Sequence, residues 1–106
     1  MRKRDVIRNL KKWVAALRSG DYEQCFGSLR KTETKFCASG VACDVIDNSS
    51  WIMHGNKYMF DGYAVGQMPL RILDHFTASD DVIERLKTIQ RLNDAVYSFN
   101  YVAAYI

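Results

Sequence analysis

The segment between Phe36 and Asp44 constrains the fold of this chain more than any other, because its side chains are small. Within it the sequence reads Cys-Ala-Ser-Gly-Val-Ala-Cys. Such small residues allow another part of the chain to pack closely against the backbone, so we expect a tight contact here. The thiols of Cys37 and Cys43, with that of the earlier Cys25, admit three interpretations: metal ligands, a redox pair or a buried structural seam. Each interpretation implies a different protein.

The spacing of the cysteines favours the structural interpretation. Five residues separate Cys37 from Cys43, whereas zinc-ligand pairs are typically two to four residues apart. Cys25, His54 and His75 add potential ligands without a characteristic spacing. An odd number of cysteines argues against a disulfide framework, and a free cysteine packs as a small hydrophobic residue. We therefore predict buried thiols, no metal site and no cofactor.

The sequence contains no pattern that is typical of an enzyme. No nucleophilic residue stands at a spacing from His54 or His75 that identifies a nucleophile–base pair. Gly62 and Gly66 are not followed by the Lys-Ser or Lys-Thr of a phosphate-binding loop. We predict no catalytic residues and a protein that is not an enzyme. A small enzyme or metal protein centred on the thiols stays as a third alternative.

The length and composition of the chain predict one domain with one core. The chain has 106 residues, 48% of them hydrophobic, and a single proline, as is typical of a folded globular protein. No apolar run reaches the length of a membrane span. Charged residues interrupt the first apolar stretch, so we expect no secretory signal. We predict a single domain over residues 1–106 that stays in a cytoplasm and has no membrane partner.

Two long helices are predicted from apolar residues that recur three and four positions apart. The first covers residues 5–18 and ends before Gly20, which favours a helix stop. The second covers residues 79–92. Shorter helical segments are also predicted. Each begins at a residue that favours the start of a helix: Asp21, Ser39, Pro69 or Ser98.

The strands are predicted to be short. Trp51–His54 and Lys57–Phe60 flank Gly55-Asn56, and a glycine at the first turn position favours a two-residue hairpin. Further extended segments are expected at residues 27–30, 35–36 and 63–65. This order of elements predicts a small α+β domain, with a short antiparallel sheet or hairpin packed against several helices.

Positive charge is concentrated in the first third of the chain. Residues 1–36 contain ten Lys and Arg against four Asp and Glu, whereas residues 37–106 contain five against eight. Such an asymmetry steers association with acidic surfaces, whether nucleic acid or protein. The helix over residues 5–18 would carry its cations on the faces that its apolar stripe leaves free, although a solvated face remains an alternative interpretation.

The predicted hairpin offers a second contact surface. Aromatic residues and methionines alternate along its strands, and one face of the hairpin must cover the helices. Tyr, Trp and Met that stay exposed on the other face would suit a protein interface, where such residues are enriched.

Several short motifs extend over nearly the whole chain. They read KWxxALRSGxYxQ at residues 12–24, GxLR at 27–30, FCxxGVxCD at 36–44, LND at 92–94 and SFxxVAxYI at 98–106. Together they resemble a family of small proteins encoded by phages and prophages. The chain departs from that pattern at Ala38, where the family has a second cysteine, and at Ser39 and Ala95.

The resemblance implies a phage accessory protein that acts by stoichiometric binding to a host macromolecule in the host cytoplasm. The role that we expect from it is inhibition of a host defence or other host complex, as anti-CRISPR proteins do. A small nucleic-acid-binding regulator that uses the basic N-terminal helix is the alternative. The predicted partner-binding residues are Arg4, Arg8, Lys11, Lys12, His54, Asn56 and Tyr58.

Overall fold

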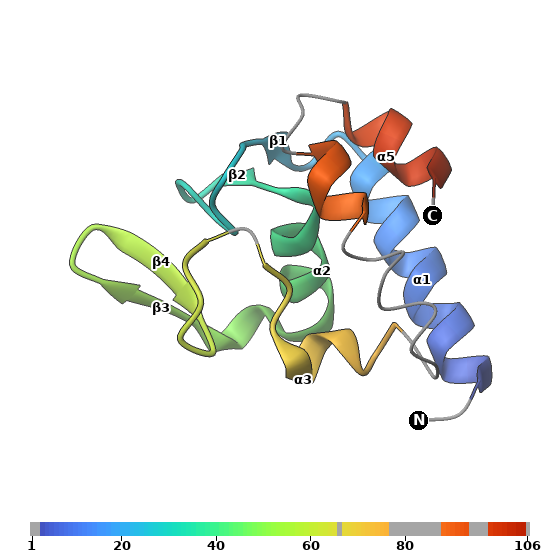
Figure 1. Ribbon diagram of the computed structural model, residues 1–106, viewed down its shortest axis with the longest axis horizontal. Helices are drawn as coiled ribbons and strands as arrows, with labels where there is room; N and C mark the ends of the chain where they lie inside the picture. Colours follow the sequence, from blue (N-terminus) through green and yellow to red (C-terminus); the bar gives the residue numbers. More distant parts are fainter. Residues whose placement is uncertain (1–2, 66, 77–87, 94–97, 106) are drawn as a thin grey trace.

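Helices make up most of the fold, and two short two-stranded sheets lie beside them (Figure 1). The computed structural model describes residues 3–65, 67–76, 88–93 and 98–105. The elements, in chain order, are α1 (Lys3–Arg18), β1 (Glu23–Gln24), β2 (Lys35–Phe36), α2 (Ala38–Asp47), the 3-10 helix η1 (Asn48–Ser50), β3 (Trp51–His54), β4 (Lys57–Phe60), α3 (Leu70–Leu73) and α5 (Phe99–Tyr105). Residues 88–93 are also helical. This mixture of elements confirms the predicted small α+β domain.

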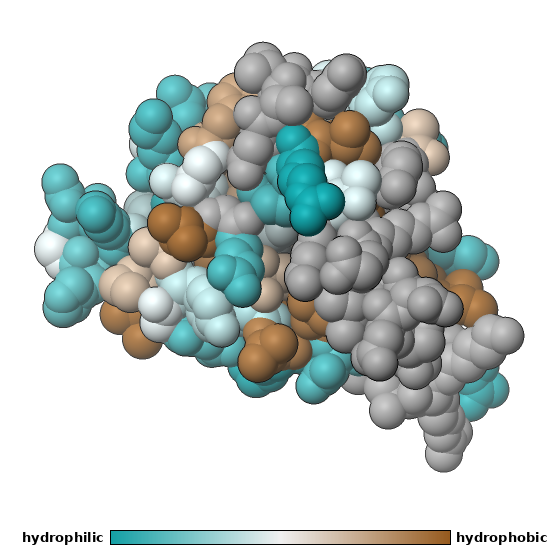
Figure 2. All heavy atoms as spheres, in the orientation of Figure 1, coloured by the Kyte–Doolittle hydropathy of each residue, from teal (hydrophilic) through white to brown (hydrophobic). Residues whose placement is uncertain are grey.

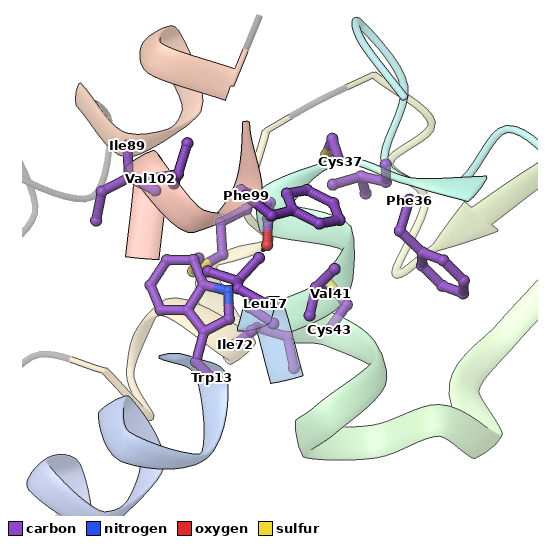
Figure 3. Packing of buried hydrophobic residues seen from close by; sticks show 14 of the residues in the cluster. Trp13, Leu17, Phe36, Cys37, Val41, Cys43, Ile72, Ile89, Phe99 and Val102 are labelled. Carbon is purple, nitrogen blue, oxygen red and sulfur yellow. Dashed lines mark hydrogen bonds between the residues drawn. The ribbon is translucent and has the colours of Figure 1, made fainter. Parts of the chain in front are cut away.

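Helix α1 follows its predicted boundaries closely and lies along one side of α2 (Figure 1). Its inner face buries Val6, Trp13 and Leu17. Trp13 points into the main cluster of buried hydrophobic residues, among side chains from α2, α3 and α5 (Figure 3). Gly20 has a φ of 82°, the left-handed conformation that lets the chain leave the helix.

The predicted helical turn at residues 21–24 is wrong. This segment is extended instead, and β1 pairs in parallel with β2. The amide of Glu23 donates to the carbonyl of Thr34, and the amide of Cys25 donates to the carbonyl of Phe36. These amides form hydrogen bonds with a strand more than ten residues further along the chain. No helix therefore starts at Asp21, although its side chain favours a helix cap.

The first turn of α2 is the tight contact that the small residues predict. A Cβ atom built on Gly40 would lie 1.8 Å from the carbonyl oxygen of Leu29, so only glycine fits there. The Leu29 carbonyl accepts a hydrogen bond from the Cys37 amide. The predicted cap of this helix is wrong: Cys37, not Ser39, caps it, because the Gly40 amide donates to the Cys37 sulfur.

A buried asparagine joins this turn to the C-terminal part of the chain. The side-chain oxygen of Asn93 accepts from the Ala38 amide, at 3.1 Å, and from the side chain of Gln24. Its side-chain nitrogen donates to the carbonyl of Cys25, at 3.1 Å. Asn93 is fully buried. Its carboxamide therefore forms the hydrogen bonds that backbone groups of two separate segments would otherwise make with water.

The predicted hairpin is confirmed, with Trp51 opposite Phe60 and His54 opposite Lys57. Gly55 has a φ of 64°, as the two-residue turn requires. The third strand predicted over residues 63–65 does not extend this sheet. Tyr63 closes a tight turn with Phe60, and Val65 forms an isolated bridge with Ser28.

The closing helices agree with the sequence where the structure describes them. Pro69 precedes α3, and the hydroxyl of Ser98 accepts from the Tyr101 amide at the start of α5. Phe99, Val102 and Ala103 are buried on one face of α5. Most of the helix predicted over residues 79–92 lies outside the described residues, and its last part, from residue 88, is helical.

We predict that Gly40→Ala destabilises the protein by about 3 kcal/mol or more, because the methyl group would overlap a backbone oxygen and force α2 away from Leu29. The matched control is Gly62→Ala. Gly62 has open space around it, so its replacement meets only the strain of a positive φ and should lower the free energy of unfolding by about 1 kcal/mol. Urea unfolding of the two variants measures the difference. Equal costs would contradict the tight contact.

We predict that Asn93→Ala destabilises the protein by about 3 kcal/mol, since the Ala38 amide and the Cys25 carbonyl lose a buried partner. The control, Asn100→Ala, removes an exposed carboxamide from α5 and should change stability by less than about 0.5 kcal/mol. Thermal and urea unfolding provide the measurement. A small effect of Asn93→Ala would show that water replaces the carboxamide.

Candidate functional site

The three thiols are buried, as predicted, and none of them forms a disulfide bond. Cys37 and Cys43 are completely inaccessible to solvent and Cys25 is nearly so. Burial raises the pKa of Cys37 to about 12, and burial also raises the pKa of Cys43. A thiol that stays protonated at neutral pH is a poor nucleophile and a poor metal ligand. Within the residues that the structure describes, no three His, Cys, Asp or Glu side chains are grouped so as to hold a metal ion.

The cations predicted to bind a partner lie together on the outer side of α1. They line a shallow groove of about 490 Å³, which we call the basic groove. The remaining lining residues are apolar, and Ile7 is 44% exposed. Arg8 forms an exposed ion pair with Asp5, with 2.6 Å between the two atoms. The residues of the basic groove are Arg4, Ile7, Arg8, Lys11, Lys12 and Ala15.

The hairpin residues predicted to bind a partner have different surroundings. His54 and Asn56 are exposed near the turn. Tyr58 is half-buried, with the guanidinium of Arg30 4.2 Å from the centre of its ring. Two large hydrophobic side chains on β3 are exposed, Ile52 at 64% and Met53 at 52%. Figure 2 shows mainly hydrophilic side chains at the tip of the hairpin and hydrophobic ones nearer the body of the molecule.

Arg30 is a residue whose role the sequence did not reveal. Its guanidinium also lies over the rings of Phe36, at 4.7 Å, and Trp51, at 5.4 Å. It donates to the backbone carbonyls of Thr32 and Glu33, which fixes the loop before β2. Such cation–π contacts stabilise the hairpin against the body of the protein. No local sequence signal marks Arg30, because its partners come from three separate segments.

A carboxylate ties the hairpin to α2. Asp44 accepts hydrogen bonds from the hydroxyl of Tyr22, at 2.7 Å, and from the indole of Trp51, at 3.0 Å. Burial, and then the hydrogen bond to Asp44, raise the pKa of Tyr22. The ring of Trp51 in turn packs edge-on against Phe36 and Phe60. The base of the hairpin is therefore held rigidly, while its tip extends outward.

A shallow pocket of about 350 Å³ lies beside the hairpin, lined by Ser49, Ser50, Ile52, His54, Met59, Asp61 and Gly62. Its rim is organised by Arg71, which donates to both carboxylate oxygens of Asp61 and to Asp47. The hydroxyls of Ser50 and Ser49, followed by the guanidinium of Arg71, lower the pKa of Asp47 to about 2. These contacts hold η1, α3 and the turn after β4 together.

The structure does not bring the two predicted groups of contact residues together. The hairpin projects from one end of the longest axis, and α1 lies at the other end (Figure 1). That axis measures 38 Å. A partner that touched both groups would have to extend across the whole molecule, so the basic groove and the hairpin are two separate candidate surfaces.

Residues 6–106 match a family described as a domain of unknown function, DUF8296. Because the match covers almost the whole chain, the protein belongs to this family. No curated protein and no solved structure matches the chain. Among the described residues, no helix is both long and apolar enough to cross a membrane.

We predict that Asp47 makes the stability pH-dependent in the acid range. Its pKa falls from 3.8 to about 2 on folding, so its contribution is present above about pH 4 and is lost as the pH falls toward 2. Urea midpoints measured between these pH values should decline more steeply for the wild type than for Asp47→Asn. Ser50→Ala should lie between the two. Parallel curves for all three proteins would contradict the assignment.

Proposed function

We propose that this protein is a non-enzymatic binding protein that acts stoichiometrically on an acidic macromolecule of a host cell. The observation that carries the proposal is the basic groove on α1, where four cations surround Ile7 and Ala15. Among the described residues no carboxylate lines the groove, although Asp5 pairs with Arg8 beside it. A cluster of one sign attracts a partner of the opposite sign and accelerates its association.

The apolar residues in the basic groove favour a protein as the partner. Protein interfaces combine an apolar centre with a polar rim, and Ile7 lies among Arg4, Arg8 and Lys11 in this way. A surface that binds phosphates non-specifically needs only cations and polar groups. The nucleic-acid-binding regulator therefore ranks second, although the same cations would serve it.

The resemblance to proteins encoded by phages and prophages is our reason for expecting a host partner. Under this proposal the protein acts in the host cytoplasm and inhibits a host defence or other host complex by occupying an acidic surface. The hairpin residues His54 and Asn56 would serve a second contact, separate from α1. All three cysteines are buried, and burial raises the pKa values of Cys37 and Cys43, so the cysteines have a packing role in this account.

We predict that Lys11→Glu/Lys12→Glu reduces recovery of the host partner at least tenfold in pull-downs with tagged protein, because it reverses the charge of the basic groove. The matched control is Lys31→Glu/Lys35→Glu. It makes the same change of net charge at two exposed residues away from α1, one in the loop before β2 and one at the first position of β2. Circular dichroism and thermal unfolding of each variant confirm that the fold is retained.

Nuclease treatment of the lysate separates the two candidate functions. A partner recovered equally with and without nuclease supports a protein target, whereas recovery that depends on intact nucleic acid supports the regulator. Equal losses for the α1 variant and the control variant would contradict the proposal that the basic groove is the contact.

A further inference from the structure

The exposed side of α1 carries three parallel ridges with a groove on each side of the middle one. The middle ridge consists of Ile7, Lys11 and Ala15, which are four residues apart. The second groove, which we call the apolar groove, has a volume of about 440 Å³ and lies beside the basic groove. The outer ridges are Arg4, Arg8 and Lys12 along the basic groove, and Leu10, Val14 and Arg18 along the apolar groove.

Ridges of residues four apart, separated by grooves, are the surface with which helices pack against each other. The grooves extend from Arg4 to Arg18, which is about 21 Å along the axis, or about four turns. Helix α1 lies at the end of the molecule away from the hairpin (Figure 1). Because helices pack through such ridges and grooves, another helix is the element whose shape matches this surface.

We propose that α1 binds an acidic amphipathic helix of the partner, an inference that rests on the proposed function and names the class of its target. One ridge of that helix, made of residues such as Leu, would enter the apolar groove over Leu10 and Val14. The neighbouring ridge would carry Asp or Glu and lie over the cations of the basic groove. The two grooves share Ile7, Lys11 and Ala15, so one helix engages both at once.

The charges on α1 favour this occupant over a second copy of the same chain. Two copies packed through α1 would bring Arg4, Arg8 and Lys12 of each molecule close to one another, and like charges at an interface oppose association. A neutral helix would bring no opposite charge to these cations. An acidic helix matches both the charge and the apolar groove.

The test uses two synthetic peptides of about 18 residues with identical composition. In the amphipathic peptide, Leu residues form one helical ridge and Glu residues form the next. In the permuted peptide, the same residues are dispersed around the helix. We expect the amphipathic peptide to bind the full-length protein with a Kd below about 100 μM, and at least about ten times more tightly than the permuted one.

A charge-neutral variant tests the location of binding. Ala15→Trp places a large side chain on the ridge between the grooves and should weaken binding of the amphipathic peptide at least tenfold. The control is Ala104→Trp, at an exposed alanine of α5. Fluorescence anisotropy with labelled peptides gives the Kd values, and circular dichroism confirms that both variants fold.

Three results would overturn the inference: equal affinity for the two peptides, no binding of the amphipathic peptide, or an affinity that Ala15→Trp leaves unchanged. If one of these results occurs while Lys11→Glu/Lys12→Glu still abolishes capture of the host partner, the proposed function stands. Only the inference that the partner binds through an acidic helix is then excluded. If the charge reversal is also without effect, the proposed function fails as well.

Discussion

The fold depends on the close approach between the first turn of α2 and the backbone of Leu29. Only glycine fits at position 40 against the Leu29 carbonyl. This contact places Ala38 where its amide and its carbonyl both form hydrogen bonds with side chains. The amide donates to Asn93, and the carbonyl accepts from the indole of Trp13, at 2.9 Å. One turn thus joins α1, the extended segment around Leu29 and the C-terminal part of the chain. A side chain at position 40 would force this turn away from Leu29 and strain all three connections.

This constraint also determines which face of α1 is exposed to solvent. Because the indole of Trp13 is held by the Ala38 carbonyl, and Val6 and Leu17 are buried on the same side, the rotation of α1 about its own axis is fixed. The ridges that include Lys11 and Lys12 then face solvent. The small residues of α2 therefore help to orient the surface of α1 that we propose as the binding site.

The parts of this fold that depend on neighbouring residues could be predicted from the sequence, and those that depend on distant partners could not. The period of α1 and the turn at Gly55 are encoded locally, and both predictions are confirmed. The extended conformation of Glu23 depends on pairing with β2, and the position of Arg30 depends on rings from three segments. For the candidate site, the sequence interpretation joined the cations of α1 to residues of the hairpin such as His54 of β3, and the hairpin lies at the other end of the molecule (Figure 1).

The cations on α1 repel one another in the isolated protein, and a partner of opposite charge would offset this repulsion. Arg4 and Arg8 are four residues apart, as are Arg8 and Lys12, and like charges at this spacing destabilise a helix by about 0.2–0.5 kcal/mol per pair. The ion pair with Asp5 offsets part of this cost. An acidic helix bound along these ridges would remove the repulsion and cover Ile7 in a single step, which is why the apolar and the cationic residues are best explained together.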